Sequence, residues 1–334
     1  MLLSTNIAAT QARPTYAVTA QIAGSGGSWD YATIDEDAGR LYLAQRGVTA
    51  LDLKTGRLNT GLLAGGVTHG VALLGDGKVA VADSKSESVK IFEGATGKIL
   101  ADISTAQYDP ISGSHTLDAL VVEPKTGLIV AVNGESGILL LIDQKLLRVV
   151  DTITVGGNPE FAAADGNGSV YINVNDGKVN EIVAADIAAK HIVRRIPLAD
   201  CEDPTGLAYD HEDQLLISVC ANGLAKFVRA DNGKEVASLS VGKGADAVIF
   251  DPRRRLVFIP GGADGTLTVI SIRNPRKIAV VQNLVTQKGA RLGSVDINTG
   301  RVYLPTATLA EPVPPSPYPS VVPGTFKILV VAPN

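Results

Sequence analysis

The stretch that decides the fold is DTITVGGNPEFAAADGNGSVYIN, residues Asp151 to Asn173. It contains three short apolar segments separated by two turns rich in Gly, Asn and Asp. Residues of these types accept the positive backbone φ that a tight hairpin turn requires. The stretch therefore predicts antiparallel β-strands joined by short connections.

The second part of this stretch recurs along the chain as an apolar strand, a turn rich in Asp, Gly or Pro, and another apolar strand. Seven copies are present, and their starts lie 40 to 48 residues apart. The copies are DYATIDEDAGRLYLA from Asp30, GVALLGDGKVAVA from Gly70, DALVVEPKTGLIVA from Asp118, EFAAADGNGSVYIN from Glu160, GLAYDHEDQLLIS from Gly206, DAVIFDPRRRLVFI from Asp246 and LGSVDINTGRVYL from Leu292. Self-similarity at a fixed period indicates a repeat architecture.

A second hairpin follows each copy, as in SVKIFEGATGKILADIS from Ser88 to Ser104. Each repeat therefore has four antiparallel strands, which we name A to D from the inside outward. This period with four strands is typical of propeller blades, including WD40-like repeats. Strands such as Ile138 to Asp143 are apolar on both faces, as a sheet packed between two others requires. The sequence predicts an all-β fold, a seven-bladed β-propeller made by residues 13–334 as one domain.

The last repeat contains only three of its four strands. The segment YAVTAQI, Tyr16 to Ile22, matches the outer strands of other repeats, such as VVDTITV from Val149 to Val155. We predict that it pairs with the C-terminal strand FKILVVAP, Phe326 to Pro333. This pairing closes the ring and covers two sheet edges that are otherwise exposed.

The repeats resemble those of the YVTN-repeat propellers, the YncE-like proteins. The matching stretches are Asp151 to Asn173, SLSVGKGADAVIFDPRRRLVFI from Ser238 to Ile259, and EPKTGLIVAVN from Glu123 to Asn133. The literal YVTN tetrad is absent, and Val170 to Asn173 is the nearest match. The resemblance implies the propeller architecture and a periplasmic or secreted location. It implies no reaction, because a fold does not fix a function.

Composition limits the classes of partner. Hydrophobic residues make up 45% of the chain and charged residues 19%, which is typical of a globular protein with a sizeable core. The formal net charge of −4 argues against nucleic acid as a partner, since such proteins usually carry a basic face. No stretch approaches the roughly 20 apolar residues of a membrane span. We expect a monomer.

Residues 1–12, MLLSTNIAATQA, have two interpretations. A short apolar start followed by small residues resembles the tail of a secretory signal peptide, although a basic region is missing and the apolar run is short. The alternative is a disordered terminus. The first interpretation agrees with an exported protein.

Long connections are predicted on one face of the ring. In this topology the connections into strand A and between strands B and C surround one end of the central channel, which we call the mouth. Two of them are long, residues 104–116 and the Pro-rich residues 305–325. Long loops in compact domains are commonly functional or disordered. The Pro-rich segment is expected to make no strand pairs. It is either a lid over the mouth or, alternatively, a floppy surface loop or a docking segment for a partner.

Polar residues at the starts of the inner strands are the candidate ligand-binding residues. Seven blades would bring them together around the mouth, and they are Trp29, Asp30, His69, His115, Asp118, Glu160, Asp203, Asp246 and Arg291. Converging carboxylates favour a cation, and imidazoles extend the choice to transition metals. The candidate ligands of a divalent metal cofactor are His69, His115, Asp118 and Glu160. Arg291 is suited to grip a carboxylate or phosphate. The alternative is structural, with each carboxylate accepting backbone N–H groups of a neighbouring blade.

The two cysteines are predicted to form a disulfide. Cys201 precedes strand A of the fifth repeat and Cys220 follows strand B, so adjacent antiparallel strands place both near the mouth. Two buried free thiols are the alternative, and an oxidising compartment favours the bond.

Three functions follow from these features. The first is an exported propeller that binds a small molecule, metal ion or protein at the mouth. The second is a metal-assisted enzyme of the lactonase or lyase kind, which uses the same mouth. The third is binding of single-stranded DNA, which the resemblance suggests and the acidic charge opposes. The GxSxG, P-loop and GxGxxG motifs are absent from the sequence, so the chemistry of common nucleophile and phosphate sites is not indicated.

Overall fold

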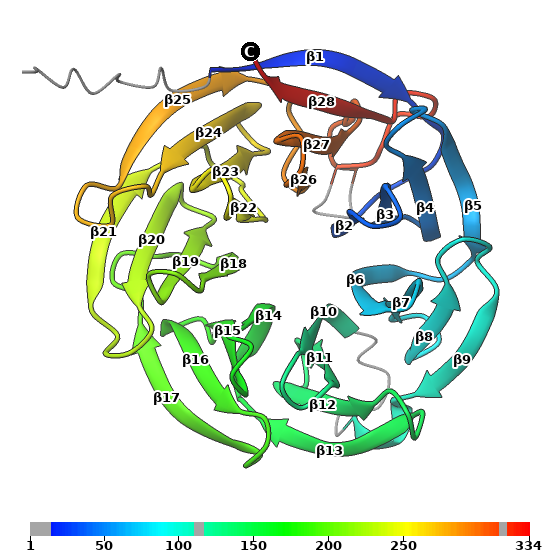
Figure 1. The fold of residues 1–334 in the computed structure, drawn as a ribbon, viewed down its shortest axis with the longest axis vertical. Coiled ribbons are helices and arrows are strands. Elements are labelled where there is room, and N and C mark those ends of the chain that lie inside the picture. The colour runs from blue at the N-terminus through cyan, green and yellow to red at the C-terminus, as the bar shows by residue number, and fades with distance from the viewer. Residues whose placement is uncertain (1–14, 110–116, 314–318) are drawn as a thin grey trace, which may run out of the picture.

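The computed structural model describes residues 15–109, 117–313 and 319–334, which form seven four-stranded antiparallel sheets in a ring (Figure 1). The first strand of each blade lies nearest the central axis and the last lies at the rim (Figure 1). The prediction of a seven-bladed propeller is confirmed. In the described part of the chain, no helix has the length and apolar character needed to span a bilayer.

The strands follow the chain blade by blade, except that the seventh blade takes its outer strand from the N-terminal end. Blades 1 to 3 consist of β2 (Ala32–Asp35), β3 (Arg40–Ala44), β4 (Gly47–Asp52), β5 (Leu58–Ala64); β6 (Thr68–Gly75), β7 (Lys78–Asp83), β8 (Ser88–Glu93), β9 (Ile99–Ser104); and β10 (Leu117–Glu123), β11 (Leu128–Asn133), β12 (Ile138–Asp143), β13 (Arg148–Thr154). Blades 4 and 5 consist of β14 (Asn158–Ala164), β15 (Ser169–Asn175), β16 (Asn180–Asp186), β17 (His191–Pro197); and β18 (Pro204–Asp210), β19 (Leu215–Cys220), β20 (Leu224–Arg229), β21 (Glu235–Ser240). Blades 6 and 7 consist of β22 (Ile249–Asp251), β23 (Leu256–Gly261), β24 (Thr266–Ser271), β25 (Ala279–Val285); and β26 (Ser294–Asp296), β27 (Arg301–Thr306), β28 (Lys327–Pro333), β1 (Tyr16–Ala23). A 3₁₀ turn, η1 (Ala106–Tyr108), follows β9.

The N-terminal strand closes the ring, as the sequence predicts. β1 pairs antiparallel with β28, from Tyr16 opposite Pro333 to Ala23 opposite Lys327. Gln282 of β25 ties this strand to blade 6, because its side-chain amide accepts from the Tyr16 N–H and donates to the Tyr16 carbonyl, both at 2.8 Å. The Tyr16 ring also packs edge-on against Phe258.

Apolar side chains fill the layers between neighbouring blades. Five of the six residues of β12 are buried, so its two faces both contact other blades. One shared layer joins Ala80 and Ile91 of blade 2 to Leu140 and Ile142 of blade 3. Burial of each leucine or isoleucine side chain contributes about 1.5–3 kcal/mol, which makes these layers the main source of stability.

The Pro-rich insertion between β27 and β28 departs from the prediction at its stem. Leu309 and Val321 form an antiparallel bridge, and the Ala310 N–H donates to the Ser320 carbonyl at 2.8 Å. The stem can pair because residues 308–310 and 320–322 contain no proline. The tip, residues 314–318, and residues 110–116 of the other long connection lie outside the described residues.

Candidate functional site

Backbone bulges at the mouth aim the candidate residues. The A–B strand pairing shifts register between Thr68 and Val71, between Leu117 and Leu120, and between Pro159 and Ala162. The bulged segments contain His69, Asp118 and Glu160, respectively. A bulge inserts an unpaired residue and redirects its side chain, which is why bulges often lie beside functional sites.

Gly70 lets two of these segments approach closely. A Cβ atom at this position would lie 2.5 Å from the Asp118 carbonyl oxygen and 2.4 Å from the Leu120 nitrogen. Only glycine therefore fits between the inner strands of blades 2 and 3. The glycine brings His69, the preceding residue, close to Asp118.

The candidate residues surround a cavity of about 410 Å³ at the mouth. Blades 1, 4 and 6 contribute one carboxylate each and blade 3 contributes two, and the lining residues are Asp30, Tyr31, His69, Leu117, Asp118, Gly134, Glu135, Asn158, Glu160 and Asp246. The fold thus joins side chains from distant parts of the sequence, as the sequence analysis expects.

Three of these residues have the arrangement of a metal site. Ligand atoms of Asp30, His69 and Asp118 all lie within 4.8 Å of one another. Asp30 is fixed by a backbone pair with β3, in which its N–H donates to the Ala44 carbonyl at 2.9 Å. His69 Nδ1 lies 2.6 Å from Asp30 Oδ2. A carboxylate that orients an imidazole in this way is common both in metal sites and in acid–base pairs.

Asp118 and Glu160 share a proton-binding site. Their carboxyl groups are hydrogen-bonded to each other, and Asn158 Nδ2 donates to Glu160 Oε1 at 3.1 Å. Burial, with the negative charges of Asp30, Glu160 and Asp246, holds the pKa of Asp118 well above its usual range. Burial and the charge of Asp246 raise the pKa of Glu160 to about 7. The pair therefore gains by holding a proton or a cation near neutral pH.

Asp246 and Arg291 form the remaining charged pair at the mouth. Arg291 Nε lies 3.3 Å from Asp246 Oδ2, and the Asp246 N–H donates to the Arg291 carbonyl at 3.1 Å. Burial raises the pKa of Asp246, while Arg291 acts in the opposite direction. The mouth is thus strongly acidic, with the Arg291 guanidinium at its edge.

Tyr31 is a site residue that sequence reasoning missed. It lines the mouth and also a second cavity of about 440 Å³, which runs along the channel between the inner strands. Its ring packs on Phe161, with centroids 4.8 Å apart. Burial and the four surrounding carboxylates raise the pKa of Tyr31 well above its usual range. In the sequence, its position directly after Asp30 is the feature that could have identified it.

Three predicted residues in the described part of the chain do not line this cavity: Trp29, Asp203 and Arg291, which adjoins it through Asp246. Trp29 is 8% exposed and packs against Phe326, so it belongs to the core. Asp203 is hydrogen-bonded to Asn175 in the blade 4–5 connection and is exposed. His115 lies outside the described residues.

Cys201 and Cys220 are joined by a disulfide, with their Cα atoms 5.4 Å apart. Both residues are buried, and the bond connects the segment before β18 to the end of β19. It braces the connection that carries Asp203.

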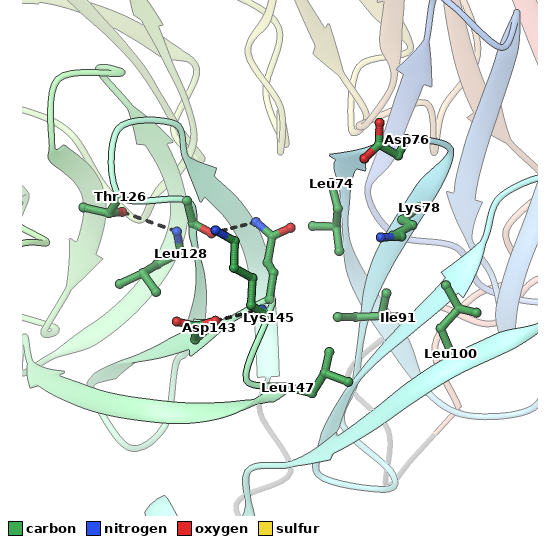
Figure 2. Close-up of a pocket in the computed structure, with 12 residues that line it drawn as sticks. Leu74, Asp76, Lys78, Ile91, Leu100, Thr126, Leu128, Asp143, Lys145 and Leu147 are labelled. Atoms are coloured by element: carbon green, nitrogen blue, oxygen red, sulfur yellow. Dashed lines mark hydrogen bonds between the residues drawn. The ribbon is translucent and has the colours of Figure 1, made fainter.

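A cavity of about 520 Å³ lies on the opposite face, between the turns of blades 2 and 3 (Figure 2). Two of its polar side chains, Asp143 and Gln144, are hydrogen-bonded to the backbone of the turns. Asp143 accepts from the N–H group of Lys145 at 2.7 Å (Figure 2) and from that of Leu146 at 2.9 Å. The side chain of Gln144 donates to the Gly127 carbonyl. The mouth, where charged groups face one another, is therefore the candidate site.

Comparison with known proteins supports the architecture. No family model matches the chain, and no curated protein matches it. Among solved structures, the chain is similar to Kuenenia stuttgartiensis hydrazine synthase with a TM-score of 0.72 and 13% sequence identity, over 84% of this chain and 92% of that one. At this identity the likeness shows the propeller fold alone.

Proposed function

We propose that this propeller binds a divalent cation at the mouth through Asp30, His69 and Asp118. The observation that carries the proposal is the grouping of their ligand atoms within 4.8 Å, beside two further carboxylates. Four converging acidic groups repel one another, and a cation relieves this repulsion. Mixed oxygen and nitrogen ligands suit transition metals such as Mn²⁺ or Zn²⁺. Three protein ligands would leave positions on the metal open for a small molecule.

Calorimetric titration with Mn²⁺ tests this proposal. We expect one ion per chain and, at 100 times the dissociation constant, a stabilisation of about 2.7 kcal/mol. Asp30→Asn and Asp118→Asn should each remove this binding. Asp203→Asn is the matched control, because Asp203 is an exposed carboxylate on the same face outside the cavity. If neither Mn²⁺ nor Zn²⁺ binds to the unaltered protein, the proposal is wrong.

We also propose that the protein is exported to an oxidising compartment, periplasmic or extracellular. The Cys201–Cys220 disulfide supports this location, since such bonds persist mainly outside the cytosol. Cell fractionation of the native protein, with thiol labelling of each fraction, tests it. Cytosolic protein with two free thiols would contradict it.

A metal-assisted hydrolase or lyase is the second candidate function. Two observations favour it: the hydrogen bond between Asp30 and His69, and the pKa of Glu160 of about 7, which suits proton transfer at neutral pH. Turnover of a lactone panel by the Mn²⁺-loaded protein should fall by roughly 10²-fold or more in Glu160→Gln. Equal turnover in the two proteins would exclude this role for Glu160.

A further inference from the structure

The guanidinium of Arg291 offers free donors at the edge of an otherwise acidic mouth. Its Nε lies beside Asp246, and its two terminal nitrogens have no partner among residues 15–109, 117–313 and 319–334. The side chain is 47% exposed, so these donors are accessible. A guanidinium with a free edge binds a carboxylate through two parallel hydrogen bonds.

The position of Arg291 separates it from the proposed metal ligands. Arg291 precedes the inner strand of blade 7 and pairs with Asp246 of blade 6, whereas Asp30, His69 and Asp118 come from blades 1, 2 and 3. Asp246 lines the same cavity as these ligands. One small molecule in the mouth can therefore contact a metal with one end and Arg291 with the other.

A metal at Asp30, His69 and Asp118 and the guanidinium of Arg291 would give the mouth two separate positive points, which favour an anion with two acidic ends. Carboxylates alone would repel any anion, but a bound divalent cation compensates two of their charges. The Arg291 guanidinium then provides a second positive point in the mouth. A cavity of about 410 Å³ lies within the range of small-molecule sites.

We infer that the ligand of this site is a small dicarboxylate, with one carboxylate on the metal and the other on Arg291. This inference rests on the proposed metal site and names the class of molecule that the site takes. The terminal nitrogens of Arg291 supply the specificity for the second carboxylate. The neutral amide analogue would leave them without an anionic partner.

Titration of the Mn²⁺-loaded protein with malonate, succinate and glutarate, each beside its monoamide, tests the inference. We expect at least one dicarboxylate to bind about tenfold or more tightly than its monoamide, as a charged hydrogen-bonding partner predicts. Arg291→Gln should weaken that dicarboxylate by about tenfold and remove the discrimination. Arg291→Lys keeps the positive charge but cannot donate two parallel hydrogen bonds, so its affinity for the dicarboxylate should lie between those of the unaltered protein and Arg291→Gln. It is the test variant if Arg291→Gln does not fold.

Arg46→Gln is the matched control, since Arg46 is an exposed arginine on a B–C connection of the same face. It should leave both affinities unchanged. Dicarboxylate binding equal in the unaltered and Arg291 variants, or no preference over the monoamides, overturns the inference while Mn²⁺ binding stands. Absence of Mn²⁺ binding in the unaltered protein overturns the metal site and this inference together.

Discussion

Two aspartates of blade 3 show how different the two faces of the propeller are. Asp143 ends β12 on the turn face (Figure 2), and there the N–H groups of Leu146 and Lys145 hold the pKa of its carboxyl below its usual value. Asp118 lies at the start of β10 on the mouth face, where burial and three other carboxylates raise its pKa. The residue type and the blade are the same, but the surroundings reverse the direction of the shift.

The difference separates structural from ligand-binding carboxylates. On the turn face, backbone amides solvate the acidic groups, and the same pattern lowers the pKa of Asp52. Asp176, in a B–C connection on the mouth face but outside the cavity, is held by backbone amides in the same way. In the described part of the mouth, no backbone N–H donates to the carboxyl groups of Asp118, Glu160 or Asp246. The structural alternative for the mouth carboxylates, with backbone donors from a neighbouring blade, therefore does not describe them. Their charge is left for a proton or a cation.

The grouping of the mouth residues depends on ring closure, because an open ring would separate them. Deletion of residues 13–23 removes β1, exposes β28 and breaks the Gln282–Tyr16 hydrogen bonds. We expect the free energy of unfolding to fall on the order of 5 kcal/mol, a large part of a typical total. Urea unfolding followed by circular dichroism measures it. Unchanged stability would mean that β1 does not close the ring.

Matched Asp-to-Asn changes on the two faces should have unequal costs. Asp251 is fully buried on the turn face, where its two oxygens accept from the N–H and side chain of Arg254, both at 2.9 Å. Asp251→Asn should cost about 1–3 kcal/mol, since it leaves Arg254 poorly paired. Asp118→Asn should be neutral or stabilising without metal, because it removes repulsion. If urea unfolding with chelator present shows the same loss of stability for Asp251→Asn and Asp118→Asn, the distinction between structural and ligand-binding carboxylates is wrong.

Glu160 in the mouth cavity and Asp143 on the turn face should also respond oppositely to pH. Glu160 has a folded pKa of about 7, above its model-peptide value of 4.5, so its stabilising contribution is complete below pH 4.5 and is lost as pH rises through 7. Asp143 has a lowered pKa, so its contribution is present above its unfolded value of 3.8 and is lost at lower pH. In chelator, Glu160→Gln should flatten the decline in Tm between pH 5 and 7.5 by roughly 2–5 °C. Parallel profiles for variant and unaltered protein would contradict this.

The sequence predicts the blades and most of the mouth residues, because repeat phase alone assigns each segment to a strand. Asp30, His69, Asp118, Glu160 and Asp246 all occupy the predicted end of the channel. The bulges that aim these side chains depend on pairing between strands, which no repeat pattern records.

Two features of the mouth required the three-dimensional structure. Tyr31 adjoins Asp30, yet its ring lies at the boundary between the mouth and the channel, where Phe161 of blade 4 supports it. Trp29 and Asp203 both come shortly before an inner strand, but Trp29 lies in the core and Asp203 on the exposed surface. The direction of a side chain depends on local backbone geometry, and sequence position gives only the end of the channel.

The most direct test of a cation site at the mouth is an anomalous difference map from crystals soaked in Mn²⁺. The structure predicts a peak within roughly 2.0–2.6 Å of ligand atoms from Asp30, His69 and Asp118. Peaks confined to other parts of the surface, with no ion among these three residues, would contradict it.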